Sequence, residues 1–340
     1  MDFENRINRW REIYNPSLRK KKVQYLIDYP QPDNKMPILN AKNKQKRIDW
    51  AKRLYDWQIK NTEMYEDDSL PHLFPITGTE IFAEAFGCEV RYPENNMPFA
   101  IPLVFDSVAA SKLKVPKLED TPLMMLFDIM DELRSFAGND ALIRLPDMQG
   151  PMGSAVLIWD KNDLFLAMID DPEAVLELAG KVKELLIAFL DEWFSRYGTK
   201  YISHFPAYYM EGGITMSACE IGCFSPQMYR TFFADEINEL SRRYGGVGIH
   251  TCADSILQWD NLKQVENLKL LNLHRPWEQI VSAFEFFEDT CVQMHYKHDN
   301  SNITPDEIES LPERCRIVLP LTAANLDEAK RLAEGYEKFR

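Results

Sequence analysis

The feature that most constrains the fold of this chain is an alternation of short apolar runs, rich in β-branched residues, with longer amphipathic segments. The alternation is typical of a parallel α/β fold, because every crossover between parallel strands needs a connection long enough for a helix. Eight such runs fit a single closed (β/α)8 TIM barrel better than an open sheet. The predicted strands are 72–76, 141–145, 201–205, 214–216, 247–250, 268–273, 291–295 and 316–319.

Helix signals lie between these runs. Asp171-Pro172 predicts the start of a helix that ends at Gly198, and Ser225-Pro226 predicts another that ends at residues 245–246. Thr304 begins a capping box before the last strand. The first 65 residues are polar and lysine-rich, with helical spacing of apolar residues over 42–66. We therefore expect an N-terminal helical extension, 1–65, followed by one barrel, 66–340.

Charge and composition exclude several classes of protein. A net charge of -14 disfavours nucleic acid as a partner. Residues 1–30 lack the apolar core of an export signal, and no stretch approaches the roughly 20 apolar residues of a membrane span. Six cysteines without an export signal suit a reducing compartment. The sequence thus predicts a cytoplasmic protein that does not bind a membrane, whose cysteines serve the core, a metal or catalysis.

Histidines gather at the ends of the predicted strands, where barrel enzymes place their chemistry. His204, His250, His274 and His295 fall at or near four different strand ends. This placement predicts a polar mouth in which His274 and His295 take part in catalysis. The alternative is that these histidines are satisfied within the core.

A metal site is predicted where two neighbouring loops meet. His250 and Cys252 end one strand, and Cys219 and Glu220 follow the preceding one. Imidazole and thiolate are preferred zinc ligands, and a catalytic zinc has three protein ligands and one open position. Glu220 is the alternative third ligand or a general base, with a surface acid beside the Ser225 helix as the plainer interpretation.

Further polar residues are candidates for binding a small-molecule substrate. Asp147 and Tyr208 follow predicted strands and are expected to line the pocket together with His204. Arg275 can hold an anionic group, because its guanidinium matches a carboxylate. Aromatic residues in such positions are more often packed in the core.

Two stretches of the chain resemble the uroporphyrinogen decarboxylase superfamily. The first is Gly150-Pro151-Met152 with Asp171-Pro172-Glu173, and the second runs from Gly212 through Ser225-Pro226 to His250-Thr251-Cys252-Ala253-Asp254. The resemblance covers about residues 65–340. The arginine-rich N-terminal segment and the late Gly-His-Gly of the true decarboxylases are absent, so the chain is more similar to the corrinoid-linked methyltransferase branch.

That resemblance implies a methyl transfer between a corrinoid protein and a small acceptor, a thiol or a folate. It implies zinc on His250, Cys252 and a later cysteine, but this chain has Thr322 or Ala323 at that place. Cys219 or Glu220 would then substitute as the third ligand, or no zinc is bound, as for a non-thiol acceptor. The Asp-x-His-x-x-Gly cobalamin motif is absent, so the corrinoid would come from a partner protein, and a homodimer is a further expectation. A decarboxylase of another carboxylated substrate and a non-catalytic binding barrel are the alternatives.

Overall fold

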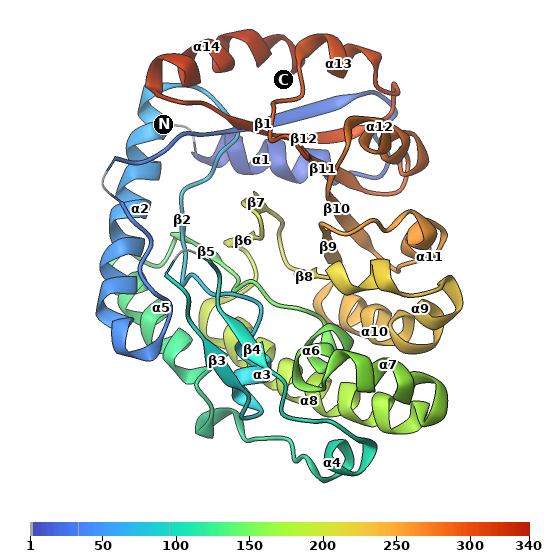
Figure 1. Cartoon of the computed structure of the whole chain (residues 1–340). Helices are drawn as coiled ribbons and strands as arrows, with labels where there is room; N and C mark the ends of the chain where they lie inside the picture. The colour runs from blue at the N-terminus through green and yellow to red at the C-terminus, as the bar shows by residue number, and fades with distance from the viewer. Residues whose placement is uncertain (1–2, 33, 95) are drawn as a thin grey trace.

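The computed structural model describes residues 3–32, 34–94 and 96–340 and arranges its strands in a ring surrounded by helices (Figure 1). Six strands form one sheet in which every neighbouring pair is parallel. In spatial order they are β1 (Lys22–Asp28), β12 (Arg316–Thr322), β11 (Val292–Lys297), β10 (Leu268–Arg275), β9 (Val247–Thr251) and β8 (Ile214–Ser217).

The remaining strands complete the ring or lie outside it. A four-stranded sheet contains, in order, β2 (His72–Leu73), β5 (Leu142–Arg144), β6 (Ile202–His204) and β7 (Tyr208–Tyr209). Its pairs are parallel except β6 with β7. A separate hairpin joins β3 (Glu89–Arg91) to β4 (Phe99–Ile101). The predicted α/β barrel architecture is confirmed.

The prediction of a closed barrel is corrected in one respect: the strands form two separate sheets, and in the residues that the structure describes no continuous hydrogen-bonded ladder closes the ring. Among the described residues, a bridge between Gln149 and Ser217 spans one seam between the two sheets. At the other seam, the Asp68 backbone donates to the carbonyl of Tyr25, and the Asp67 carboxylate accepts from the backbone of Ile27. At the two seams, these contacts therefore satisfy backbone N–H and C=O groups of the sheet edges, which a continuous hydrogen-bonded sheet would otherwise pair.

All eight predicted runs contain strands, but β1 was not predicted. Its five central residues are buried, and it pairs in register with β12 from Lys22–Arg316 to Asp28–Thr322. The N-terminal 65 residues thus add a strand to the ring as well as helices. The sequence analysis missed this strand because charged residues flank a short apolar run.

Fourteen α-helices occur in the described part of the chain, and most of them cover the outside of the ring (Figure 1). They are α1 (Phe3–Ile13), α2 (Lys44–Met64), α3 (Ile81–Ala85), α4 (Ser107–Lys112), α5 (Met124–Ala137), α6 (Pro151–Ile158), α7 (Lys161–Asp170), α8 (Pro172–Tyr197), α9 (Pro226–Phe232), α10 (Ala234–Tyr244), α11 (Trp259–Lys263), α12 (Trp277–Phe286), α13 (Pro305–Ser310) and α14 (Leu326–Tyr336).

The helix predictions are confirmed with one correction. The helix after Asp171 ends at the Gly198 cap, and Thr304 forms the capping box of α13. The helix after Ser225 was predicted as continuous to residues 245–246, which is wrong. It is interrupted at Phe233, where α9 ends and α10 begins. Phe233 is buried in the core, so packing overrides the local helix signals there.

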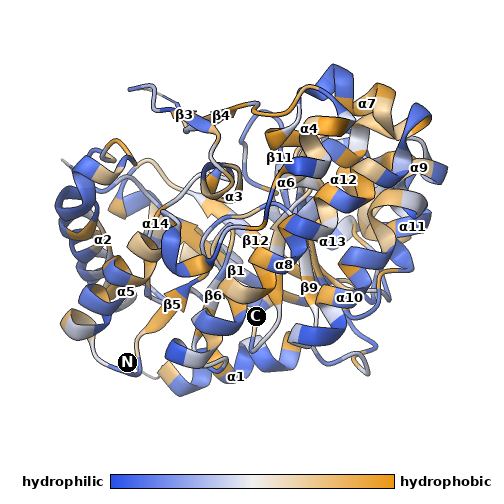
Figure 2. Cartoon of the chain, turned by 90° about the horizontal axis from the view of Figure 1, so that it is seen from below, coloured by the Kyte–Doolittle hydropathy of each residue, from blue (hydrophilic) through white to orange (hydrophobic). Residues whose placement is uncertain are grey.

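One end of the ring is closed by α1. Ile7, Trp10 and Ile13 of this helix pack in one apolar cluster with inward-facing strand residues such as Leu270 and Val292. These two residues lie near the starts of their strands, so α1 covers the N-terminal end of the barrel. Apolar residues of the helices pack in the core clusters, and Figure 2 shows hydrophilic residues predominating on outer helices such as α2. No helix in the described ranges is both long and apolar enough to span a bilayer.

Candidate metal centre

Cys219, His250 and Cys252 come together at the open, C-terminal end of the ring. Each offers one ligand atom, and these atoms all lie within 4.8 Å of one another. His250 lies near the end of β9 and Cys252 directly follows that strand, while Cys219 opens a 3-10 turn after β8. β8 and β9 are parallel neighbours with Ser217 opposite His250. The predicted adjacency of these two loops is therefore confirmed.

The two sulfur atoms are in direct contact. Cys219 Sγ lies 2.9 Å from Cys252 Sγ, and the backbone N–H of Cys252 donates to Cys219 Sγ at 3.2 Å. This is longer than a disulfide bond of about 2.05 Å, and both cysteines are free. The hydrogen bond that Cys219 donates lowers the pKa of Cys252. The same hydrogen bond raises the pKa of Cys219, since that thiol is the donor.

A buried asparagine fixes the orientation of His250. Asn272 is 1% exposed, its amide N–H donates to the carbonyl of Met294, and its Oδ1 lies at the Nδ1 of His250. Because Oδ1 can only accept, Nδ1 carries the proton and Nε2 is left free as a ligand. Sequence analysis missed Asn272, although a polar residue inside an apolar strand was a usable signal.

The donor set fits zinc. Two thiolates and one imidazole are zinc ligands, and bonds of about 2.0–2.3 Å would place them roughly 3.3–3.8 Å apart in a tetrahedron. The observed limit of 4.8 Å needs only small side-chain adjustments. Three protein ligands leave the fourth position open, as in catalytic rather than structural zinc sites. Of the two alternatives for the third ligand, the geometry brings Cys219 to the site.

Glu220 lies beside this trio but points elsewhere. Its Oε1 is directed at α6, where a Cβ added to Gly153 would lie 2.6 Å away, and its Oε2 is buried without a hydrogen-bond partner. Burial raises the pKa of Glu220 to about 7. The carboxylate therefore packs against α6 and not against the helix that follows Ser225.

Two further candidates lie close to the trio. Asp147 follows β5 and accepts a hydrogen bond of 2.8 Å from Ser217, the residue opposite His250. Burial raises the pKa of Asp147. His274 is two residues beyond Asn272 on β10 and shares its face of the strand. Its Nε2 donates to the carbonyl of Lys297 on β11 at 3.1 Å.

The other predicted site residues lie apart from this centre. His204 and Tyr208 are buried and stacked on each other at 5.3 Å, with His204 Nε2 donating to the carbonyl of Met210. His295 faces α12 and lies 4.8 Å from the ring of Phe284. Successive residues of a strand face opposite sides, and Met294 takes the inward position.

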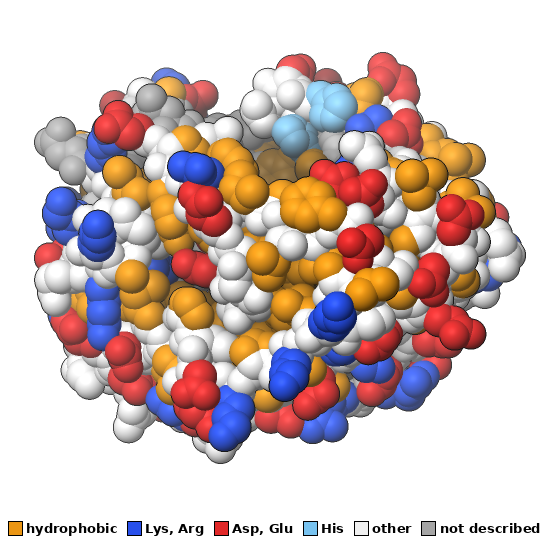
Figure 3. Space-filling model, turned by 60° about the horizontal axis from the view of Figure 1, so that its bottom comes forward, with side chains coloured by type: hydrophobic (Ala, Val, Ile, Leu, Met, Phe, Trp, Pro, Cys, Tyr) orange, Lys and Arg blue, Asp and Glu red, His pale blue; other side chains and the backbone are white. Residues whose placement is uncertain are grey.

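Arg275 also serves a structural contact. Arg275 forms an ion pair of 3.4 Å with Asp254 and donates a hydrogen bond of 2.7 Å to Gln279. These two contacts connect the loop after β9 to α12. Of the four histidines predicted at the mouth, the structure therefore brings only His250 into the trio of ligand atoms; His274 contacts Lys297 and His298, and His204 and His295 lie in the core. Figure 3 shows histidine side chains beside a hollow, on a face where acidic and basic groups alternate.

A ring of strands with two cysteines and a histidine gathered at its C-terminal end defines an α/β-barrel protein with a candidate metal site. The family model described as Uroporphyrinogen decarboxylase (URO-D) matches residues 55–293, and the chain belongs to this family. The solved structure of a methyltransferase from Methanosarcina mazei aligns with a TM-score of 0.69 at 13% identity, over 99% of this chain and 98% of that chain. This likeness supports the fold. No curated protein matches the chain significantly.

Proposed function

We propose that the protein is a methyltransferase that holds zinc with Cys219, His250 and Cys252 and exchanges a methyl group between a corrinoid protein and a small acceptor. The observation that carries the proposal is the convergence of the three ligand atoms within 4.8 Å at the open end of the barrel. Membership of the family and the fold shared with a methyltransferase add support.

When bound, zinc would lower the pKa of an acceptor thiol and stabilise its thiolate. The residues of the chain prepare the site for this. Asn272 holds the His250 ring so that Nε2 faces the two sulfurs. The corrinoid would arrive on a partner protein that docks at the same open end.

The first test is the metal content of the purified protein after zinc loading. We expect about one zinc per chain, lost on Cys219→Ser, His250→Ala or Cys252→Ser. Cys223→Ser is the matched control, because Cys223 is an exposed cysteine of the same turn and is not one of the three ligands. A native protein without zinc under these conditions would contradict the metal site.

The second test is methyl transfer from free methylcobalamin to 2-mercaptoethanol, followed by the absorbance of the corrinoid. The zinc-loaded protein should accelerate the reaction, and Cys252→Ser should abolish the acceleration while Cys223→Ser keeps it. If the protein binds zinc but does not accelerate the reaction, the zinc site is retained and the proposal that the acceptor is a thiol is rejected.

A further inference from the structure

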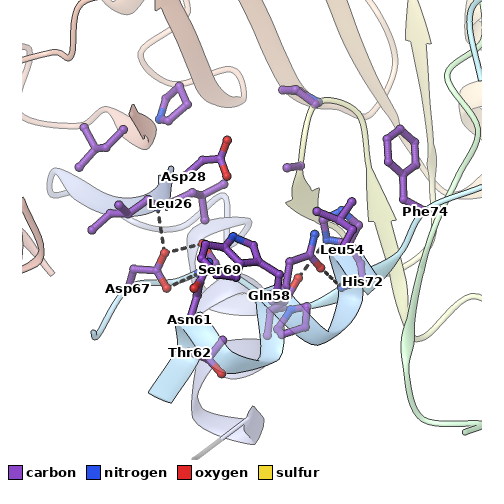
Figure 4. A pocket seen from close by; sticks show the side chains of 18 of the residues that line it. Leu26, Asp28, Leu54, Gln58, Asn61, Thr62, Asp67, Ser69, His72 and Phe74 are labelled. Atoms are coloured by element: carbon purple, nitrogen blue, oxygen red, sulfur yellow. Dashed lines mark hydrogen bonds between the residues drawn. The ribbon is translucent and has the colours of Figure 1, made fainter. Parts of the chain in front are cut away.

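A cavity of about 330 Å³ opens inside the ring at the C-terminal ends of β1, β5, β11 and β12. Figure 4 shows side chains of β1, α2 and the segment 67–74 around it, including Asp28, Gln58 and Phe74. Its volume lies at the lower end of the range that holds small molecules. The C-terminal ends of the strands are where barrel proteins bind their ligands.

One cation lines this cavity. Arg144, the last residue of β5, is 8% exposed and is the only lysine or arginine among the described lining residues. Across the described ranges, no hydrogen bond or ion pair engages its guanidinium, and its Nε is buried without a partner. Burial lowers the pKa of Arg144 only to about 10, so it is charged at neutral pH. A buried, unpaired charge is costly unless an anion completes it.

No neighbouring acid in the described ranges forms a direct ion pair with Arg144. Asp147 is close enough for its charge to raise the pKa of Arg144, but its carboxylate accepts a hydrogen bond from Ser217 and does not contact the guanidinium. Asp67 is engaged by Arg6 at 3.3 Å. The hydrogen-bonding groups of Arg144 therefore remain available to a bound anion.

Aromatic rings surround the free guanidinium. The guanidinium carbon Cζ lies 3.9 Å from the centroid of the Phe74 ring and 5.4 Å from the centroid of the Phe205 ring. Tyr296, Tyr65 and Trp57 contribute further to the cavity wall. Such walls favour a flat apolar body, because offset and edge-on ring contacts add to the burial of area. One cation with aromatic walls selects a flat molecule carrying one anionic group.

The cavity lies next to the metal centre. The Phe205 ring that faces Arg144 also meets the His250 ring edge-on, with centroids 4.9 Å apart. A single aromatic ring thus separates the unpaired cation from a metal ligand.

We propose that this cavity binds a small aromatic monocarboxylate whose carboxylate pairs with Arg144. The role of that molecule as the partner in methyl exchange rests on the proposed function, whereas its binding does not. A guanidinium forms two parallel hydrogen bonds with a carboxylate, which distinguishes an acid from its neutral amide.

The experiment is calorimetric titration of the native protein with benzoate, with benzamide as the neutral isostere and with acetate as the anion without a ring. We expect saturable 1:1 binding of benzoate, at least tenfold tighter than that of benzamide or acetate. Arg144→Met should remove the preference for benzoate over benzamide, and Arg144→Lys should keep part of it. Arg242→Met, at an exposed arginine, is the matched control.

Two outcomes would overturn the proposal: no saturable binding of benzoate to the native protein, or equal binding of benzoate by Arg144→Met. Circular dichroism shows whether Arg144→Met folds. If it does not, the relative affinities of the native protein for benzoate, benzamide and acetate still test the proposal. Cys252→Ser separates this inference from the proposed function, because it should lose zinc and retain benzoate binding.

Discussion

Asn272 on β10 holds His250 on β9 through its side-chain oxygen, while its amide nitrogen is bound to the backbone of β11. Three adjacent strands thereby fix the rotation of one imidazole ring. The orientation of this candidate ligand is thus set by the sheet, whereas the two cysteines lie in loops that follow it.

Replacing Asn272 by Ala should weaken zinc binding by about 10- to 100-fold, the usual effect of removing a residue that orients a ligand histidine. Competition with a chromophoric chelator measures this change. Asn162→Ala, at an exposed position on α7, should bind zinc like the native protein. Unchanged affinity in Asn272→Ala would show that the hydrogen bond does not position His250.

Removal of the metal should expose Cys219 and Cys252 to oxidation. Their sulfurs lie 2.9 Å apart, so a mild oxidant such as diamide should join them in a disulfide with the loss of two hydrogens. Intact mass and peptide mapping detect the bond. Zinc should protect both thiols, and Cys252→Ser should abolish the crosslink. A zinc-loaded protein that oxidises as fast as the metal-free one would contradict the assigned ligands.

Gly248 leaves room for the hydroxyl of Tyr208. A Cβ on Gly248 would lie 1.9 Å from that hydroxyl and 3.0 Å from Thr215 Oγ1. Gly248→Ala should therefore reduce the free energy of unfolding by about 1–3 kcal/mol, as overpacking of cores does. Urea denaturation measures the loss. Adding Tyr208→Phe should restore part of it, and a Gly248→Ala protein as stable as the native one would refute the close contact.

The pH dependence of stability should carry a contribution from Glu80. This carboxylate is 4% exposed, and burial raises its pKa from 4.5 to about 7. The folded protein therefore binds the proton more tightly, so the contribution to stability is full below pH 4.5 and is lost as the pH rises through 7. Glu80→Gln should be more stable than the native protein at pH 8, by up to about 3 kcal/mol.

The comparison that tests this expectation is urea denaturation of both proteins at pH 5 and pH 8. The stability difference should shrink toward pH 5, where the native carboxyl is protonated. Glu119→Gln is the matched control, since Glu119 is an exposed carboxylate. A difference that is constant with pH would show that Glu80 does not titrate as expected.

Apolar runs located eight strands, though not β1, because parallel strands buried on both faces appear as continuous apolar stretches. The same property hides which residues face inward. Met294 faces the interior and His295 faces α12, but nothing in the sequence of that strand distinguishes the two faces. The predicted catalytic role of His295 depended on this choice.

The candidate metal ligands were predictable because their loops follow neighbouring strands. Arg144 and Asn272 were not identified, since their importance depends on partners that only the three-dimensional structure supplies. Arg144 is notable for lacking a hydrogen-bond or ion-pair partner within the described chain. The sequence carries no sign of such a lack.

The pairing of β1 with β12 joins the two ends of the chain, from Lys22 opposite Arg316 to Asp28 opposite Thr322. During synthesis, the strand made first must wait for the strand made last before its backbone is paired. Until then it is an unpaired edge, open to other chains. Shortening the C-terminus, far from the metal centre, would therefore leave the N-terminal strand without a neighbour and favour association between molecules.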